Sequence, residues 1–352
     1  MQCSTQCKKI ITHIERCSST ASAVKLHRSS LLCITQLHDK RIATCARDGS
    51  ITLSYFVINN NMYNYTWKML VHKPHAHNGE INYITEIPVL NSKYKLITCS
   101  DDGMLKIWNI SSSLHNLILE TVIQAHNDKI YQVISLSNEL ILSCSDDNTI
   151  RLWNAVLAQR MHFPYENQKQ PRALLTLTHR TNTFAMSCCG GKGYITMYSS
   201  VPPYEQQGVA VNEVYTRWSH GMIELSNGHI VLSQRKCVHV VDLMLGVICA
   251  EIRCDRIIHP FMAGSLCKVG DIGFVYVCRG NIMQVRMENG NYEVVFVKEG
   301  DGREMCGDGG VVVVGSDGEG EDGDRRWFML VDRMSEGGVT NYGVNVFKME
   351  YN

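Results

Sequence analysis

The stretch from residue 77 to residue 154 carries one pattern twice, and its two copies read HNGEI (77–81), LITCSDDG (96–103) and LKIWN (105–109), then HNDKI (126–130), ILSCSDDN (141–148) and IRLWN (150–154). Trp108 and Trp153 are 45 residues apart. A unit this short cannot bury its own hydrophobic face, so it must stack on further copies of itself. The pattern therefore predicts a repeat protein.

The two copies resemble the repeat of the WD-repeat β-propeller family. Each repeat of that family runs from a His, through a strand that ends in a small hydroxyl residue, to an Asp in a tight turn and a strand that closes on Trp-Asp. Here both copies close on Trp-Asn, and Asn, like Asp, forms turns and caps. The resemblance implies an all-β fold, a seven-bladed WD-repeat β-propeller whose C-terminal blades are divergent.

The resemblance also implies a buried, hydrogen-bonded tetrad in each copy. An indole N–H donates to a hydroxyl, the hydroxyl donates to an imidazole, and the imidazole donates to a carboxylate. The same residue types form hydrolase triads, but their recurrence in successive repeats favours a structural role. We therefore predict no catalytic residue and no enzyme. The structural tetrads are His77, Thr98, Asp102, Trp108 and His126, Ser143, Asp147, Trp153.

The pattern weakens on both sides of these copies. Upstream, His27, Thr44 and Asp48 keep the register, but Ser54 stands where Trp is expected. Downstream, short strands and Gly-rich turns remain. We predict a single β-propeller domain over 1–352, with clear repeats at 27–154 and divergent repeats at 170–352. Seven units of about 45–50 residues use the whole length, with six or eight blades left open. Either 9–14 or 344–349 supplies the strand that closes the ring.

Composition excludes several classes of function. The 34 basic and 34 acidic side chains cancel, so we expect no nucleic-acid partner. No apolar run approaches 18 residues, which predicts no membrane insertion. The 15 cysteines follow no signal-like start, and four recur at one strand position, which indicates packing in a reduced, cytoplasmic protein, with the nucleus left open. These four cysteines each follow a hydroxyl residue, in the pairs Thr44-Cys45, Thr98-Cys99, Ser143-Cys144 and Ser187-Cys188.

We expect no metal and no cofactor. The N-terminal group Cys3, Cys7, His13 and Cys17 has zinc-ligand types, but its spacing matches no common site. Cys249 and Cys254 are interpreted as strand residues. The acidic run at 317–324 resembles a calcium loop but lacks the glycine at the sixth position and the flanking helices. A solvated loop is the main interpretation of that run, with calcium or a basic partner as the alternative.

Partner binding is predicted on the rim that carries the Asp turns and the entrances of the first strands, which is the usual docking face of the family. Tyr131 and Arg47 are the best anchor types, because Tyr and Arg concentrate binding energy at interfaces. The candidate partner-binding residues precede a turn Asp or flank a first strand: Arg47, Asp101, Asp146, Glu80, Asn82, Lys129 and Tyr131.

The predicted function is a non-enzymatic protein-interaction scaffold or adaptor, a monomeric propeller within a larger complex of other proteins. A rigid ring holds loops from separate blades in place, which lowers the ordering cost of binding. One alternative is a substrate receptor of a ubiquitin-ligase complex, although no Trp-Asp-x-Arg tetrapeptide follows either repeat. The other is an enzyme with its site at the channel mouth, for which the sequence offers no carboxylate or metal cluster.

Overall fold

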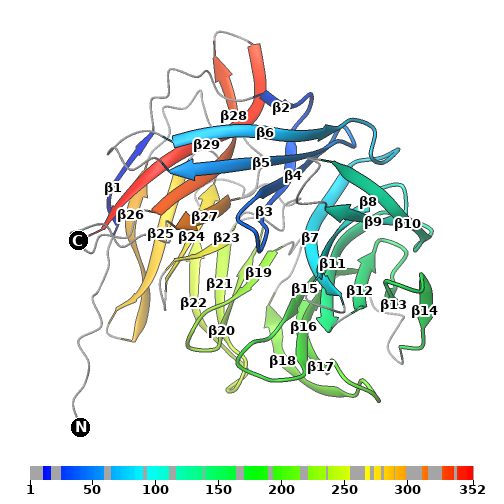
Figure 1. Cartoon of the computed structure of the whole chain (residues 1–352). Coiled ribbons are helices and arrows are strands. Elements are labelled where there is room, and N and C mark those ends of the chain that lie inside the picture. Colours follow the sequence, from blue (N-terminus) through cyan, green and yellow to red (C-terminus); the bar gives the residue numbers. More distant parts are fainter. Residues whose placement is uncertain are drawn as a thin grey trace.

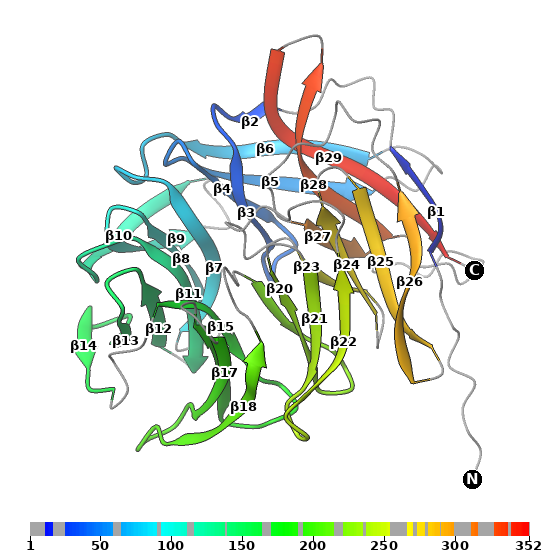
Figure 2. The same ribbon diagram turned by 180° about the vertical axis from the view of Figure 1, so that it is seen from behind.

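The chain folds as a ring of antiparallel β-sheets (Figures 1 and 2). The structure is a computed structural model, and its described part contains 29 strands and no helix. The residues that it describes are 11–16, 25–58, 65–89, 93–110, 116–137, 139–163, 170–188, 193–214, 221–234, 237–253, 266–269, 273–278, 281–288, 290–298, 311–315, 327–336 and 339–351.

Six of the sheets have four strands, which follow one another in sequence order across each sheet, and we call them blades 1 to 6. Blades 1 to 3 consist of β3 (Leu31–Gln36), β4 (Ile42–Ala46), β5 (Ile51–Ile58) and β6 (Tyr65–Lys73); β7 (Ile81–Val89), β8 (Lys93–Ser100), β9 (Met104–Ile110) and β10 (Leu117–Gln124); and β11 (Ile130–Ser137), β12 (Leu140–Ser145), β13 (Ile150–Asn154) and β14 (Gln159–Met161). Blades 4 to 6 consist of β15 (Pro171–Thr176), β16 (Thr183–Cys188), β17 (Gly193–Ser199) and β18 (Gln206–Val214); β19 (Gly221–Glu224), β20 (His229–Ser233), β21 (Cys237–Asp242) and β22 (Val247–Arg253); and β23 (Leu266–Val269), β24 (Gly273–Cys278), β25 (Asn281–Glu288) and β26 (Asn291–Lys298).

The remaining sheet, blade 7, joins the two ends of the chain. Its C-terminal strands are β27 (Val311–Gly315), β28 (Trp327–Glu336) and β29 (Val339–Tyr351). Both β1 (Ile11–Arg16) and β2 (Lys25–His27) pair antiparallel with β29. The described residues 11–14 and the segment 344–349, which belong to the two alternatives for closing the ring, therefore lie in the same sheet.

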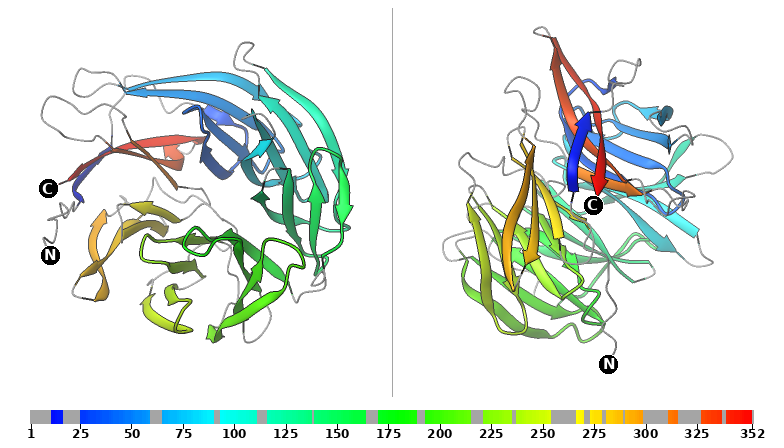
Figure 3. Two further views of the ribbon diagram at one scale, coloured as in Figure 1. Left: turned by 60° about the horizontal axis from the view of Figure 1, so that its bottom comes forward. Right: turned by 90° about the vertical axis from the view of Figure 1, so that its left-hand side faces the viewer.

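The first strands of successive blades contact one another around the ring, and β27 contacts β3 (Figure 3, left). This last contact brings blade 7 against blade 1. Since no blade buries both of its faces alone, each depends on its two neighbours, as the short repeat predicts.

The hydrophobic core lies between neighbouring blades rather than within one. Trp108 of blade 2, for example, packs in one buried cluster with Leu53 of blade 1, and Trp153 packs with Ile97 across the next boundary. The cysteines that recur after a hydroxyl residue are all free and buried, which confirms that their role is packing. These residues are Cys45, Cys99, Cys144 and Cys188.

Candidate functional site

The structure brings the four side chains of each predicted tetrad together. In blade 2 the indole N–H of Trp108 donates to Thr98 Oγ1 at 3.0 Å, and this oxygen lies 2.8 Å from His77 Nε2. His77 Nδ1 in turn lies 3.0 and 3.1 Å from the two carboxylate oxygens of Asp102.

Blade 3 repeats the geometry almost without change. Trp153 Nε1 donates to Ser143 Oγ at 3.0 Å, and Ser143 Oγ lies 2.7 Å from His126 Nε2. His126 Nδ1 lies 3.0 and 3.1 Å from the carboxylate oxygens of Asp147. Both tetrads are therefore chains of hydrogen bonds from an indole to a carboxylate.

Burial keeps the two tetrad imidazoles neutral at pH 7. It lowers the pKa of His126 to about 4 and lowers the pKa of His77, and the facing carboxylates offset only part of these shifts. A neutral imidazole has one donor and one acceptor nitrogen. Nδ1–H therefore donates to the carboxylate and Nε2 accepts from the hydroxyl. Burial also works to raise the pKa of Asp102, but the hydrogen bonds that it accepts outweigh burial and hold this pKa at about 2.

Each turn Asp also ties its own turn to the segment that carries the His. Asp102 accepts from the backbone N–H of Met104 at 3.0 Å and of Asn78 at 3.1 Å. Asp147 accepts from Thr149 and Asn127 in the same way, at 3.0 and 3.2 Å. An acceptor-only carboxylate suits this position, because two backbone donors and one imidazole N–H converge on it.

Blade 1 shows how the tetrad changes when the Trp is missing. His27 Nε2 lies 2.8 Å from Thr44 Oγ1, as in the complete tetrads. Its Nδ1, however, lies 2.6 Å from Ser50 Oγ, and this hydroxyl hydrogen-bonds the Asp48 carboxylate. Sequence reasoning missed Ser50 and its counterpart Thr149, although both stand two residues after the turn Asp.

The residues that precede the turn Asp lie beside the start of the first strand in the same blade. The backbone N–H of Arg47 donates to Ser30 O, and that of Asp101 donates to Glu80 O, both at 2.9 Å. The N–H of Asp146 likewise donates to Lys129 O at 2.9 Å. This repeated bond places all seven candidate partner-binding residues on one face of blades 1 to 3, which we call the Asp-turn face.

On the Asp-turn face these residues pair mainly with one another, across the blade boundaries. Arg47 Nε of blade 1 lies 3.2 Å from Glu80 Oε2 of blade 2. Asp101 of blade 2 binds Lys129 of blade 3 at 2.6 Å and also accepts from Asn82 Nδ2 at 2.7 Å. The ion pair with Asp101 raises the pKa of Lys129.

A third link joins blades 3 and 4 through a residue that sequence reasoning missed. Asp146 Oδ2 accepts from the Tyr131 hydroxyl at 2.7 Å, and Asp146 Oδ1 lies 3.0 Å from Arg172 Nη2. The Arg172 guanidinium lies over the Tyr131 ring, 3.9 Å from its centroid, a cation–π contact. Arg172 follows the first residue of β15 just as Tyr131 follows the first residue of β11. Continuing the repeat register into the fourth unit would have found it.

Several residues singled out in the sequence lie elsewhere. Cys249 lies in β22, as predicted, and His13 lies in β1. The acidic run at 317–324 and the residues Cys3, Cys7, Cys17 and Cys254 lie outside the described residues. Within the described residues, no helix is long and apolar enough to cross a membrane.

Known proteins agree with this architecture. The family described as WD domain, G-beta repeat matches residues 68–109 and 118–154. The fold is similar to the WD40 beta propeller domain of Doa1, with 12% identity over 96% of this chain and 98% of that one and a TM-score of 0.62. It is also similar to the RRP9 WD40 repeats (14% identity, 96% of this chain and 100% of that one, TM-score 0.65). For Saccharomyces cerevisiae Sqt1 the identity is 12%, the coverage is 92% of this chain and 85% of that one, and the TM-score is 0.66.

No curated protein matches the chain in sequence. The chain contains WD40 repeats and has the fold of a WD-repeat β-propeller.

Proposed function

We propose that the chain is a protein-interaction scaffold that docks its partners on the Asp-turn face. WD40 propellers generally mediate protein–protein interactions without enzymatic activity, which supports the general role. The observation that carries the choice of face is the set of ion pairs across the blade boundaries, Arg47–Glu80, Asp101–Lys129 and Asp146–Arg172.

These pairs hold charged groups in fixed positions while leaving part of each group open to solvent. The side chains of Arg47 and Lys129 are 39% and 50% exposed, whereas that of Arg172 is only 6% exposed and holds Asp146 in place. Ordering a long charged side chain on binding costs about 0.5–1.5 kcal/mol. Side chains that are already paired have lost much of that freedom, so the face is prepared for a partner with alternating charges.

The geometry also changes which substitutions test this face. Tyr131 packs under Arg172 and hydrogen-bonds Asp146, so truncating it would disturb the boundary between blades 3 and 4. Arg47 and Lys129 are exposed, so their replacement leaves the core intact. The double variant Arg47→Glu with Lys129→Glu therefore reverses two charges on the face without opening a cavity.

A matched control is Lys68→Glu with Arg160→Glu, which makes the same change in charge on the outer strands β6 and β14 of the same two blades. The full chain and both variants are used as baits in cells of the native host, and bound proteins are quantified by mass spectrometry. We expect a reproducible set of partners to be lost from the Asp-turn variant and kept by the outer-strand variant. Equal retention of all partners by both variants would rule out this face.

A further inference from the structure

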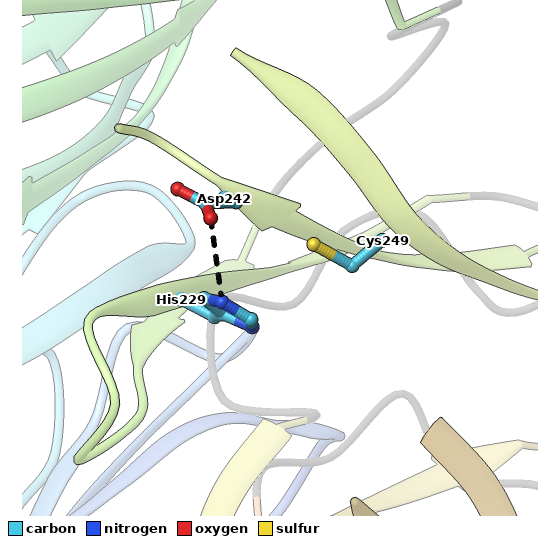
Figure 4. Close-up of side chains that lie close together, drawn as sticks. All are labelled: His229, Asp242 and Cys249. Atoms are coloured by element: carbon cyan, nitrogen blue, oxygen red, sulfur yellow. Dashed lines mark ion pairs between the residues drawn. The ribbon is translucent and has the colours of Figure 1, made fainter. Parts of the chain in front are cut away.

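Blade 5 brings a His, an Asp and a Cys together at one end of its sheet. This end is opposite the β20–β21 turn, which corresponds to the Asp turns of blades 1 to 3. His229 is the first residue of β20, Asp242 is the last residue of β21, and Cys249 lies in β22. Their ligand atoms all lie within 4.8 Å of one another, and His229 Nε2 is 3.7 Å from Asp242 Oδ2. Figure 4 shows the Cys249 side chain turned toward the other two.

The strand register explains how Cys249 reaches this position. Val241 is opposite Ile248 and Val240 is opposite Ala250, so Cys249 is the extra residue of a β-bulge. Bulges redirect side chains and recur next to functional sites. His229 and Asp242 are direct cross-strand partners in the neighbouring pair, so both project from the same face of the sheet.

Blade 2 has the same three positions filled by different chemistry. There Lys95 is opposite Asn109, and Glu120 is the extra residue of the bulge in β10. Lys95 Nζ binds Glu120 Oε2 at 2.5 Å, and Asn109 Nδ2 donates to Glu120 Oε1 at 2.7 Å. In blade 2 an ammonium group therefore supplies the positive charge at this junction of strands. Blade 5 has no such cation among its three residues, which are an imidazole, a carboxylate and a thiol.

Two of the three groups are already oriented for a ligand. Tyr292 Oη lies 2.9 Å from His229 Nδ1 and accepts from Asn227 Nδ2 at 2.8 Å, which fixes the ring and leaves Nε2 facing Asp242. Such an outer hydrogen bond on the second nitrogen is typical of metal-ligating histidines. Asp242 Oδ1 accepts from the backbone N–H groups of Met244 and Leu245, so Oδ2 is the oxygen turned toward the His.

We propose that blade 5 binds one zinc ion through His229 Nε2, Asp242 Oδ2 and Cys249 Sγ, with a water molecule in the fourth position. Nitrogen, oxygen and thiolate donors together suit Zn²⁺, whereas Mg²⁺ and Ca²⁺ require oxygen donors. In a tetrahedral zinc site ligand atoms are about 3.4–3.6 Å apart, given metal–ligand distances of about 2.0–2.3 Å. The distance between His229 Nε2 and Asp242 Oδ2 is close to this value. The Cys249 side chain is exposed, and its rotation moves Sγ by about an ångström to reach the same distance from the other two ligand atoms.

The charges and protons balance at this site. Binding displaces the thiol proton to solvent, and the neutral His229 keeps its proton on Nδ1, where it donates to Tyr292 Oη. The carboxylate and the thiolate then neutralise the two charges of the ion. Because metal binding releases the thiol proton, the affinity falls as the pH falls.

Cobalt is the direct probe of this site, because Co²⁺ bound to a thiolate absorbs light. The full chain, stripped of metal with a chelator and kept reduced, is titrated with Co²⁺ and then with Zn²⁺. We expect a thiolate-to-cobalt charge-transfer band together with the d–d bands of four-coordinate cobalt, and we expect Zn²⁺ to abolish both. Cys249→Ser removes the charge-transfer band, and Tyr292→Phe weakens binding by about 10- to 100-fold because it removes the outer hydrogen bond.

Two further variants show whether a loss of binding is local. Asp242→Asn keeps the turn-capping oxygen, just as Asn154 Oδ1 accepts from Val156 and Leu157 in blade 3, so this variant folds but binds metal at least about tenfold more weakly. Cys237→Ser is the matched control: Cys237 is at the other end of β21, 3.7 Å from His239 Nε2. The proposal is overturned if Cys249→Ser binds cobalt with the wild-type spectrum, or if Cys237→Ser loses the band instead. Neither result bears on the docking face, which lies on other blades.

Discussion

The hydroxyl at the centre of each tetrad gives a sharp test of the hydrogen-bond chain, because the central threonines of blades 1 and 2 differ in one donor, the indole N–H. Thr98 Oγ1 contacts both His77 Nε2 and Trp108 Nε1, whereas Thr44 Oγ1 contacts His27 Nε2, with Ser54 at the position of the Trp. Both threonines are buried, at 0% and 1% exposure. Replacing each by Val keeps the shape of the side chain and removes only the hydroxyl.

The expected costs follow from the number of buried groups left without a partner. Each such group costs about 1–3 kcal/mol. Thr44→Val leaves one imidazole nitrogen without a hydrogen-bond partner, so we expect a loss of about 1–3 kcal/mol in the free energy of unfolding. Thr98→Val leaves an imidazole nitrogen and an indole N–H without a hydrogen-bond partner, so we expect a loss of about 2–6 kcal/mol in the free energy of unfolding. The difference between the two variants measures the indole contribution.

Equilibrium urea unfolding of the two variants and the wild type supplies these free energies, provided that the m-values stay equal. Adding Trp108→Phe completes a double-mutant cycle, because Thr98→Val should cost only about as much as Thr44→Val once the indole is absent. The reasoning is refuted if both threonine variants lose the same free energy to within about 0.5 kcal/mol. A cycle with no coupling between Trp108 and Thr98 would refute it equally.

Three further predictions concern acid, a buried hydroxyl and a tight turn. The pKa of His126 is 6.5 in the unfolded chain and about 4 in the fold, so between these pH values only the unfolded chain binds the proton. The stability that is present above pH 6.5 is therefore lost as the pH falls to 4, by an amount on the order of 3 kcal/mol for this residue. A urea midpoint that stays constant over this pH range would contradict the prediction. Ser54 Oγ is buried without a hydrogen-bond partner in the described part of the chain, so Ser54→Ala should be neutral or stabilising by up to about 1 kcal/mol, as measured by urea unfolding. Gly103 has φ +73° and a Cβ there would lie 2.6 Å from His126 O, whereas Gly290 has φ +85° and open space around it, so Gly103→Ala should lower the melting temperature more than Gly290→Ala does.

The sequence predicted the fold from a small part of the chain. The two clear repeats carry every position that the blade needs, and residues 68–109 and 118–154 are also what the family matches. In blades 5 and 6 the prediction of short strands rested on Gly-containing turns such as Asn227-Gly228, since neither a tetrad Trp nor a turn Asp marks these blades. The exposed β14 and the short β23 depend on pairing with a neighbouring strand rather than on their own residues.

The candidate site was predictable only where the repeat register could be followed. The residues before the turn Asp lie beside the starts of the first strands, because the register fixes their position in the blade. Their pairing was not predictable, since Asp101 and Lys129 belong to different blades and meet only when blades 2 and 3 pack against each other. The same holds for the His229, Asp242 and Cys249 group, which depends on a bulge in β22 that nothing in the local sequence marks. The local sequence pattern sets the position of a residue in its blade. Which residues come into contact depends instead on the bulges in the strands and on the packing of neighbouring blades.

That division explains why the later blades can lose the repeat motif and keep the fold. Val241 stands where Trp108 and Trp153 close the tetrads, yet it packs in the buried cluster between blades 4 and 5 with Ile230 and Met197. Apolar contact between blades therefore supplies stability at this position without the hydrogen-bond chain. Once burial alone holds the blade, the polar positions at the ends of its strands are free to change chemistry. Blade 2 fills three of them with an ion pair and an amide, and blade 5 fills the same three with an imidazole, a carboxylate and a thiol.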